Sequence, residues 1–156
     1  MKSFQSYITE KHEGDGDCME AAVKLMMRSY TDYYGERFKP ASGSPFLVHG
    51  LVHGQGSLKG KRFVHAWVES GGMVYDYSNG GENELTQSQY YRIGKIDPKQ
   101  KGAYFKYSYS DMKKKLLSTG HYGPWDIDMS LEEATMTKRI GRKRKSVSPE
   151  ILKLLK

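Results

Sequence analysis

The chain has 156 residues, of which 37% are hydrophobic and 28% charged, and its formal net charge is +7. This composition excludes a largely disordered chain, and the lack of any apolar run near ~20 residues excludes a membrane span. The single cysteine excludes an intramolecular disulfide. We therefore expect a soluble cytoplasmic protein, without a signal peptide because no apolar stretch follows the early lysine.

The positive charge is concentrated at the C-terminal end. Residues 1–136 contain equal numbers of basic and acidic side chains. Residues 137–156 contain eight Lys or Arg and one acid, Glu150, which accounts for the whole net charge. We therefore divide the chain into a domain of residues 1–136 and a basic tail of residues 137–156.

The first predicted element is a helix that begins at Cys18. Asp17 is a suitable N-cap and Glu20 stands in capping-box position. Side chains at helical spacing follow at Ala22, Leu25, Met26 and Ser29. The pattern indicates a buried amphipathic helix of roughly three to four turns that ends near Gly35.

Strand patterns occupy the middle of the chain. They cover residues 46–56, 62–69, 73–77 and 103–110. The second and third flank Gly71-Gly72, a common two-residue hairpin turn. Residues 78–84 are expected to form a loop, and residues 87–97 have no clear pattern.

Short helices are predicted after the last strand. One starts at Ser110 or Asp111 and stops at Gly120. A capping box of Ser130 and Glu133 indicates a second helix, over residues 131–140. A third begins with Ser148 as cap and Pro149 at its first position. One helix, then strands, then helices predicts an α+β fold, with the helix bearing the cysteine packed on a mostly antiparallel sheet.

The hairpin places a histidine and an aspartate on one sheet face. Alternation and the Gly-Gly turn put Trp67 opposite Asp76 and His65 opposite Ser78. His65 and Asp76 are then diagonal neighbours, about 7–8 Å apart at the backbone. A carboxylate in this position orients an imidazole and stabilises its protonated form.

The cysteine stands where a thiolate would be stabilised. At a helix N-terminus, the helix dipole and backbone N–H groups favour the anion of Cys18. A nearby protonated histidine would lower the thiol pKa further, and the same N–H groups would bind an oxyanion. We therefore predict that Cys18, His65 and Asp76 form one catalytic cluster.

These residues carry a resemblance. G-x-C-x-x-A at Gly16, Cys18 and Ala21, H-A-W-V-E at 65–69 and Asp76 resemble the papain-like thiol hydrolases, most of all their transglutaminase-like branch. The resemblance covers residues 14–80 and implies Cys18 as nucleophile, His65 as general base and Asp76 as orienting acid. Members hydrolyse peptides, deamidate Gln or Asn, or transfer acyl groups to amines. The short chain suggests a small phage- or bacteria-encoded member, acting in the host cytoplasm if phage-encoded.

Three further residues are assigned to substrate binding. Trp67 shares the face of His65 and would shield the His–Asp pair from water, whereas Glu69 on that face is expected to meet solvent. His53 ends the doubled LVHG of the first predicted strand and Gln55 lies in the Gly-rich turn that follows, and both would lie near the nucleophile.

A zinc site is the rival use of the cysteine and histidines. Cys18, His49, His53 and His65 suit that metal, but no C-x-x-C or H-E-x-x-H spacing is present. We therefore expect neither a metal nor a cofactor.

The function indicated is a cysteine-dependent hydrolase or acyltransferase acting on a peptide or carboxamide bond of a protein through an acyl-enzyme. The alternative is a non-enzymatic binding module on a degenerate hydrolase scaffold. Its basic tail would bind nucleic acid, an acidic partner or an anionic membrane surface. The cations concerned are Lys138, Arg139, Arg142, Lys143, Arg144 and Lys145, followed by the apolar stripe of Ile151, Leu154 and Leu155.

Overall fold

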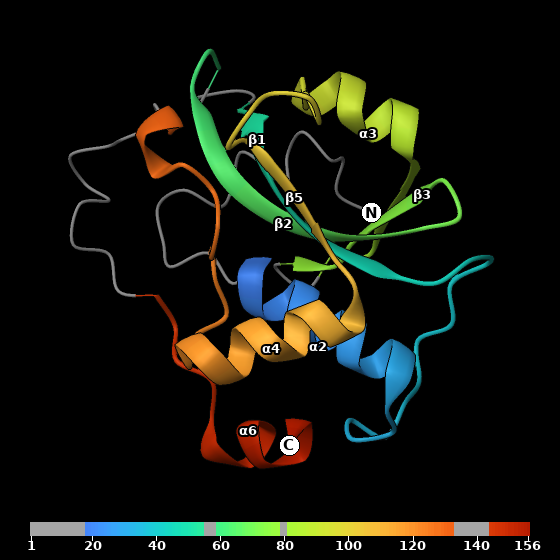
Figure 1. Ribbon diagram of the computed structural model, residues 1–156. Coiled ribbons are helices and arrows are strands. Elements are labelled where there is room, and N and C mark those ends of the chain that lie inside the picture. The colour runs from blue at the N-terminus through green and yellow to red at the C-terminus, as the bar shows by residue number, and fades with distance from the viewer. Residues whose placement is uncertain (1–17, 55–58, 79–80, 133–143) are drawn as a thin grey trace.

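The computed structural model describes residues 18–54, 59–78, 81–132 and 144–156 (Figure 1). In these ranges, five strands form one sheet in the order β4-β3-β2-β1-β5, and every neighbouring pair is antiparallel. The strands are β1 (Phe46–His53), β2 (Arg62–Ser70), β3 (Met73–Asp76), β4 (Asn83–Thr86) and β5 (Tyr104–Tyr107). The predicted α+β class and antiparallel sheet are confirmed.

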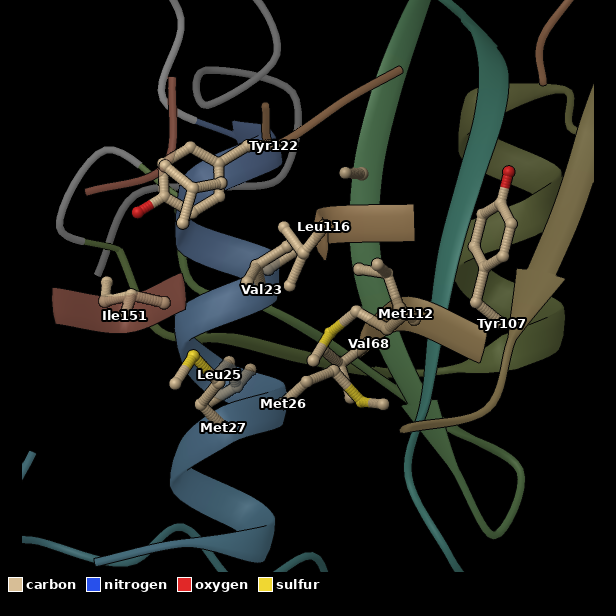
Figure 2. Close-up of a cluster of buried hydrophobic side chains, with 14 of the residues drawn as sticks. Val23, Leu25, Met26, Met27, Val68, Tyr107, Met112, Leu116, Tyr122 and Ile151 are labelled. Carbon is tan, nitrogen blue, oxygen red and sulfur yellow. The ribbon is translucent and has the colours of Figure 1, made fainter. Parts of the chain in front are cut away.

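Helices cover both faces of this sheet. One face carries α2 (Cys18–Tyr30) and α4 (Tyr109–Thr119), with α6 (Pro149–Leu155) packed against α4 on the same side of the sheet, and the other face carries α3 (Gln87–Gly94). Figure 2 shows the larger core, on the α2 face. It joins apolar side chains from α2, α4, α6 and the sheet, among them Val23, Met26, Met27, Val68, Met112, Leu116 and Ile151. None of the helices in the described ranges has the length and apolarity needed to cross a membrane.

Two helices begin as the sequence predicts. Cys18 is the first residue of α2, although the helix ends at Tyr30, before Gly35. Ser148 caps α6 by accepting a hydrogen bond from the backbone N–H of Ile151. In the predicted apolar stripe of α6, Ile151 and Leu155 are buried in the main core, whereas Leu154 is exposed.

Two other helix starts were predicted wrongly. The cap of α4 is Ser108, which accepts from the N–H of Asp111, so the helix starts earlier than expected. Ser130 lies inside the short 3₁₀ helix η4 (Met129–Leu131), whose cap is Asp128. The Asp128 carboxylate accepts hydrogen bonds from both the backbone N–H and the hydroxyl of Ser130. Ser130 is therefore bound by the cap and is not the cap itself. Glu133 and most of the helix predicted there lie outside the described residues.

β4 and α3 have no counterpart among the predicted elements. The predicted loop over residues 78–84 is wrong in part, since Asn83 begins β4. This edge strand has four residues and is defined by its backbone pairing with β3. Four residues are too few for a side-chain alternation that would predict a strand. α3 does have a sequence signal, a capping box between Thr86 and Gln89.

The hairpin turn has the predicted geometry. Gly71 and Gly72 have φ values of 57° and 81°, and Ser70 pairs with Met73 and Val68 with Tyr75. This register is the predicted one, and it keeps His65 and Asp76 on the same face.

A pair of alanine substitutions tests how the turn is fixed. A Cβ on Gly71 would lie 2.7 Å from the Ser42 carbonyl oxygen, whereas a Cβ on Gly72 meets nothing within 4 Å. Gly72→Ala should therefore lower the free energy of unfolding only by the cost of holding an alanine at positive φ, about 1–2 kcal/mol. Gly71→Ala should cost about 1–3 kcal/mol more, because the Ser42 backbone must shift. Urea unfolding measures both, and equal losses would contradict this role of Ser42.

Candidate active site

His65 lies on the α3 face of the sheet, near the middle of β2. Its ring is 2% exposed and lies between Phe63 and Trp67, with ring centroids 6.3 and 6.2 Å away. Across the sheet it pairs with Gly50, where a Cβ would come within 2.6 Å of the Trp67 ring. Glycine at position 50 therefore leaves the room that the Trp67 ring occupies beside His65.

Asp76 ends β3 and binds the histidine directly. The distance from His65 Nε2 to Asp76 Oδ2 is 2.7 Å, and the carboxylate is 1% exposed. Three further donors reach this carboxylate: the hydroxyl of Tyr90 on Oδ2, and the hydroxyl and N–H of Ser78 on Oδ1. A buried carboxylate with this many donors is stabilised as an anion.

Cys18 reaches the same imidazole from the other face of the sheet. Its side chain forms a hydrogen bond with His65. α2 packs on the opposite sheet face. Since Asp76 occupies Nε2, the nitrogen left for Cys18 is Nδ1.

The electrostatics favour a charged pair in this buried site. Burial opposes the imidazolium, but the charge of Asp76, then that of Cys18, and hydrogen bonds to both raise the pKa of His65 to about 10. Burial likewise opposes the carboxylate, yet His65, Ser78 and Tyr90 hold the pKa of Asp76 below its ordinary value. Both pKa shifts thus favour the same ion pair, a protonated His65 beside an ionised Asp76.

Trp67 and Glu69 form a hydrogen-bonded pair next to His65, on the same face of the sheet. Trp67 is buried against Tyr90, and its Nε1 donates to Glu69 Oε1 at 2.8 Å. Glu69 is only 4% exposed, so the expectation that it faces solvent is wrong. Gln87 and Tyr91 of α3 also donate to its carboxylate, and α3 thus covers a side chain that β2 alone would expose.

Of the other predicted site residues, the structure describes His53, Arg144 and Lys145. His53 is half-buried at the end of β1, and strand alternation puts it on the sheet face opposite to His65. Arg144 and Lys145 are exposed, and Lys145 forms an ion pair with Glu20 in the first turn of α2. Outside the described residues lie Gln55, Lys138, Arg139, Arg142 and Lys143.

No metal site is formed by the residues that the structure describes. Within those ranges, His, Cys, Asp and Glu side chains do not gather in any group of three or more that could hold a metal ion. His49, a predicted zinc candidate, is instead packed against the rings of Trp125 and Tyr107. Its side chain is 0% exposed, and both ring nitrogens are without a hydrogen-bond partner.

The buried His49 should weaken the fold, and more so in acid. Burial lowers its pKa to about 3, below the ordinary 6.5, so the native state resists protonation that the unfolded chain accepts. His49→Met removes two unsatisfied nitrogens at similar volume and should stabilise the protein by about 1–3 kcal/mol at pH 7. The gain should be larger at pH 5, as measured by urea unfolding at both pH values. A less stable Met variant would contradict this account.

Sequence reasoning missed Tyr90 and the role of Ser78. The hairpin register placed Ser78 opposite His65, so its contact with Asp76 could have been inferred. Tyr90 lies in residues 87–97, which gave no clear pattern, and only the position of α3 over the sheet brings its hydroxyl to Asp76.

Comparisons of the chain with protein-family models, curated proteins and solved structures give no match. What the fold and the site define is an α+β protein in which a cysteine, a histidine and an aspartate from α2, β2 and β3 converge.

Proposed function

We propose that this protein is a cysteine-dependent hydrolase or acyltransferase of the papain-like, transglutaminase-like kind, acting on a peptide or carboxamide bond. The observation that carries the proposal is that one imidazole binds both Asp76, at 2.7 Å, and Cys18. A buried carboxylate–imidazole pair next to a thiol at a helix start is what thiolate formation requires.

Acylation begins from the thiolate of Cys18 and the imidazolium of His65. The sulfur attacks the carbonyl carbon, and the C=O electron pair moves onto oxygen to give a tetrahedral oxyanion. When this collapses, the C–N bond breaks and the leaving nitrogen takes the Nδ1 proton of His65. The products of this half are an amine or ammonia and a Cys18 thioester.

Deacylation uses His65 in the opposite direction. The neutral imidazole takes a proton from a water or an amine, which attacks the thioester carbonyl. Collapse expels the Cys18 thiolate, and the imidazolium is restored. Water gives hydrolysis, whereas an amine gives acyl transfer, and the same residues serve both outcomes.

The start of α2 supplies charge stabilisation for both halves. The first N–H groups of a helix have no acceptor within the helix, and the dipole makes this end positive. Because Cys18 is the first residue of α2, an oxyanion formed on its substrate lies beside these groups. Donors of this kind typically contribute 10²–10³-fold in kcat.

Thiol labelling over a range of pH tests the proposal. If Cys18 is activated, the midpoint of its iodoacetamide labelling rate lies well below ~8.5, the ordinary thiol pKa. Because the chain has one cysteine, Cys18→Ser gives the blank. Labelling with the midpoint and rate of a simple thiol would overturn the proposal.

Acyl transfer can be followed without knowing the natural substrate. With p-nitrophenyl acetate, the protein should release a burst of about one nitrophenolate per chain, followed by slow turnover. Added amine should accelerate the slow phase if acyl transfer is favoured. The absence of a burst above that of Cys18→Ser would argue against an acyl-enzyme.

A further inference from the structure

We propose that Tyr90 is a positioning residue for the His65–Asp76 pair, which it serves by holding the carboxylate and sharing with His65 the oxygen that binds the imidazolium. The inference deepens the proposed function and rests on it for its catalytic meaning. It assigns to α3, which carries none of the three reacting residues, control over the proton affinity of His65.

The geometry at Asp76 is asymmetric. His65 Nε2 and the Tyr90 hydroxyl both bind Oδ2, each at 2.7 Å, whereas the Ser78 hydroxyl binds Oδ1 at 2.7 Å. Two donors on one oxygen compete for the same electron density. The Tyr90 hydroxyl therefore weakens the attraction that Asp76 exerts on the proton of His65.

Tyr90 is held firmly enough for this role. Its side chain is 0% exposed, and its ring packs on Trp67 with 5.1 Å between centroids. α3 starts at a complete capping box, and the next residue, Tyr91, donates to the buried carboxylate of Glu69. Adjacent tyrosines thus bind two different carboxylates on one sheet face, which fixes the rotation of the helix.

Several groups around the pair bear on its titration. Cys18 comes from α2, Ser78 follows β3, and Asn83 of β4 pairs with Asp76. Glu69 is separated from His65 by Trp67. Among these groups, Tyr90 alone shares Oδ2 with His65 in the hydrogen bonds described above.

The chemical consequence concerns the proton donor. An imidazolium whose pKa lies far above neutrality is a weak acid, so it transfers its proton to a leaving nitrogen slowly. By sharing Oδ2, Tyr90 keeps Asp76 from binding that proton too strongly, while its hydrogen bond keeps the carboxylate in line with Nε2.

Titration of His65 by ¹⁵N NMR tests this inference in the full-length chain. Both proteins carry Cys18→Ala, so that His65 titrates as a single site, and His65→Gln assigns the signal. Tyr90→Phe should raise the pKa of His65 by at least ~0.5 unit relative to the parent. An unchanged or lowered value would overturn the inference, because a merely structural tyrosine would not move the titration upward.

Tyr91→Phe is the matched control. It removes the same atom from the adjacent residue of α3, but its hydroxyl binds Glu69 rather than Asp76. It should leave the His65 pKa unchanged, and an equal rise in both variants would overturn the specific role of Tyr90. Since the titration needs no thiol, an inert Cys18 in the labelling test would overturn the proposed function alone, and the two failures are distinguishable.

Discussion

Replacing His65 by Gln should slow iodoacetamide labelling of Cys18 at pH 5 by about 10- to 100-fold. The hydrogen bond between the Cys18 side chain and the imidazole is the contact that the change removes. Without the imidazolium, the thiol pKa returns toward ~8.5, and at pH 5 less than about one thiol in a thousand is ionised. A less acidic thiol is intrinsically more nucleophilic, which offsets this loss by roughly 40- to 100-fold and leaves the slowing stated above.

The measurement is the second-order labelling rate from pH 4 to 10. In the wild-type protein we expect the labelling rate to reach its plateau at low pH and to change little above it. In His65→Gln we expect the rate to rise steeply with pH toward pH 9. His121→Gln, which changes a histidine away from the cluster, is the matched control and should keep the wild-type profile. Profiles that coincide for all three proteins would contradict activation of Cys18 by His65.

Replacing Asp76 by Asn should reduce the free energy of unfolding by about 3–5 kcal/mol at pH 6, measured in a Cys18→Ala background. The imidazolium of His65 would then be buried without a counter-charge, and Tyr90 and Ser78 would lose a charged acceptor. Removing Cys18 in both proteins leaves His65 and Asp76 as the titrating groups of the cluster.

The loss should depend on pH in a defined direction. Asp76 raises the folded-state pKa of His65 above its ordinary 6.5, so this stabilisation is complete below 6.5 and is lost as pH rises through the folded value. The lowered pKa of Asp76 adds stability above its ordinary 3.8, which is lost in acid. The difference between the two proteins should thus be largest near pH 5–6 and should narrow toward pH 10.

Urea unfolding at pH 6, 8 and 10 gives this difference directly. Glu82→Gln, which neutralises an exposed acid near the same strands, should cost less than about 0.5 kcal/mol at each pH. A loss that is constant with pH would show that Asp76 contributes only packing and neutral hydrogen bonds.

Part of the site could be predicted because it depends on local geometry. The predicted start of α2 at Cys18 is the observed one, although the predicted cap Asp17 lies outside the described residues. Alternation with a Gly-Gly turn predicted the register that puts His65 and Asp76 on one face. Both features arise from interactions within about a dozen residues of the chain. The contact between Nε2 and Oδ2 follows from that register, and the structure has it at 2.7 Å.

The environment of the site could not be predicted in this way. Glu69 was expected in solvent and is buried, because α3 brings Gln87 and Tyr91 over it. His49 was a candidate metal ligand and is packed against Trp125 and Tyr107, far along the chain from it. Tyr90 had no signal of its own.

The sequence by itself determined which cysteine, histidine and aspartate make up the candidate site, the helix start that carries the cysteine and the strand faces of the histidine and aspartate. Only the tertiary structure decided that Cys18 binds the imidazole of His65, and that Tyr90 binds the same oxygen as His65. The reason is physical: local periodicity fixes which way a side chain points from its own element. Which side chain it meets depends on how separate elements pack, and that is decided by burial summed over the whole chain.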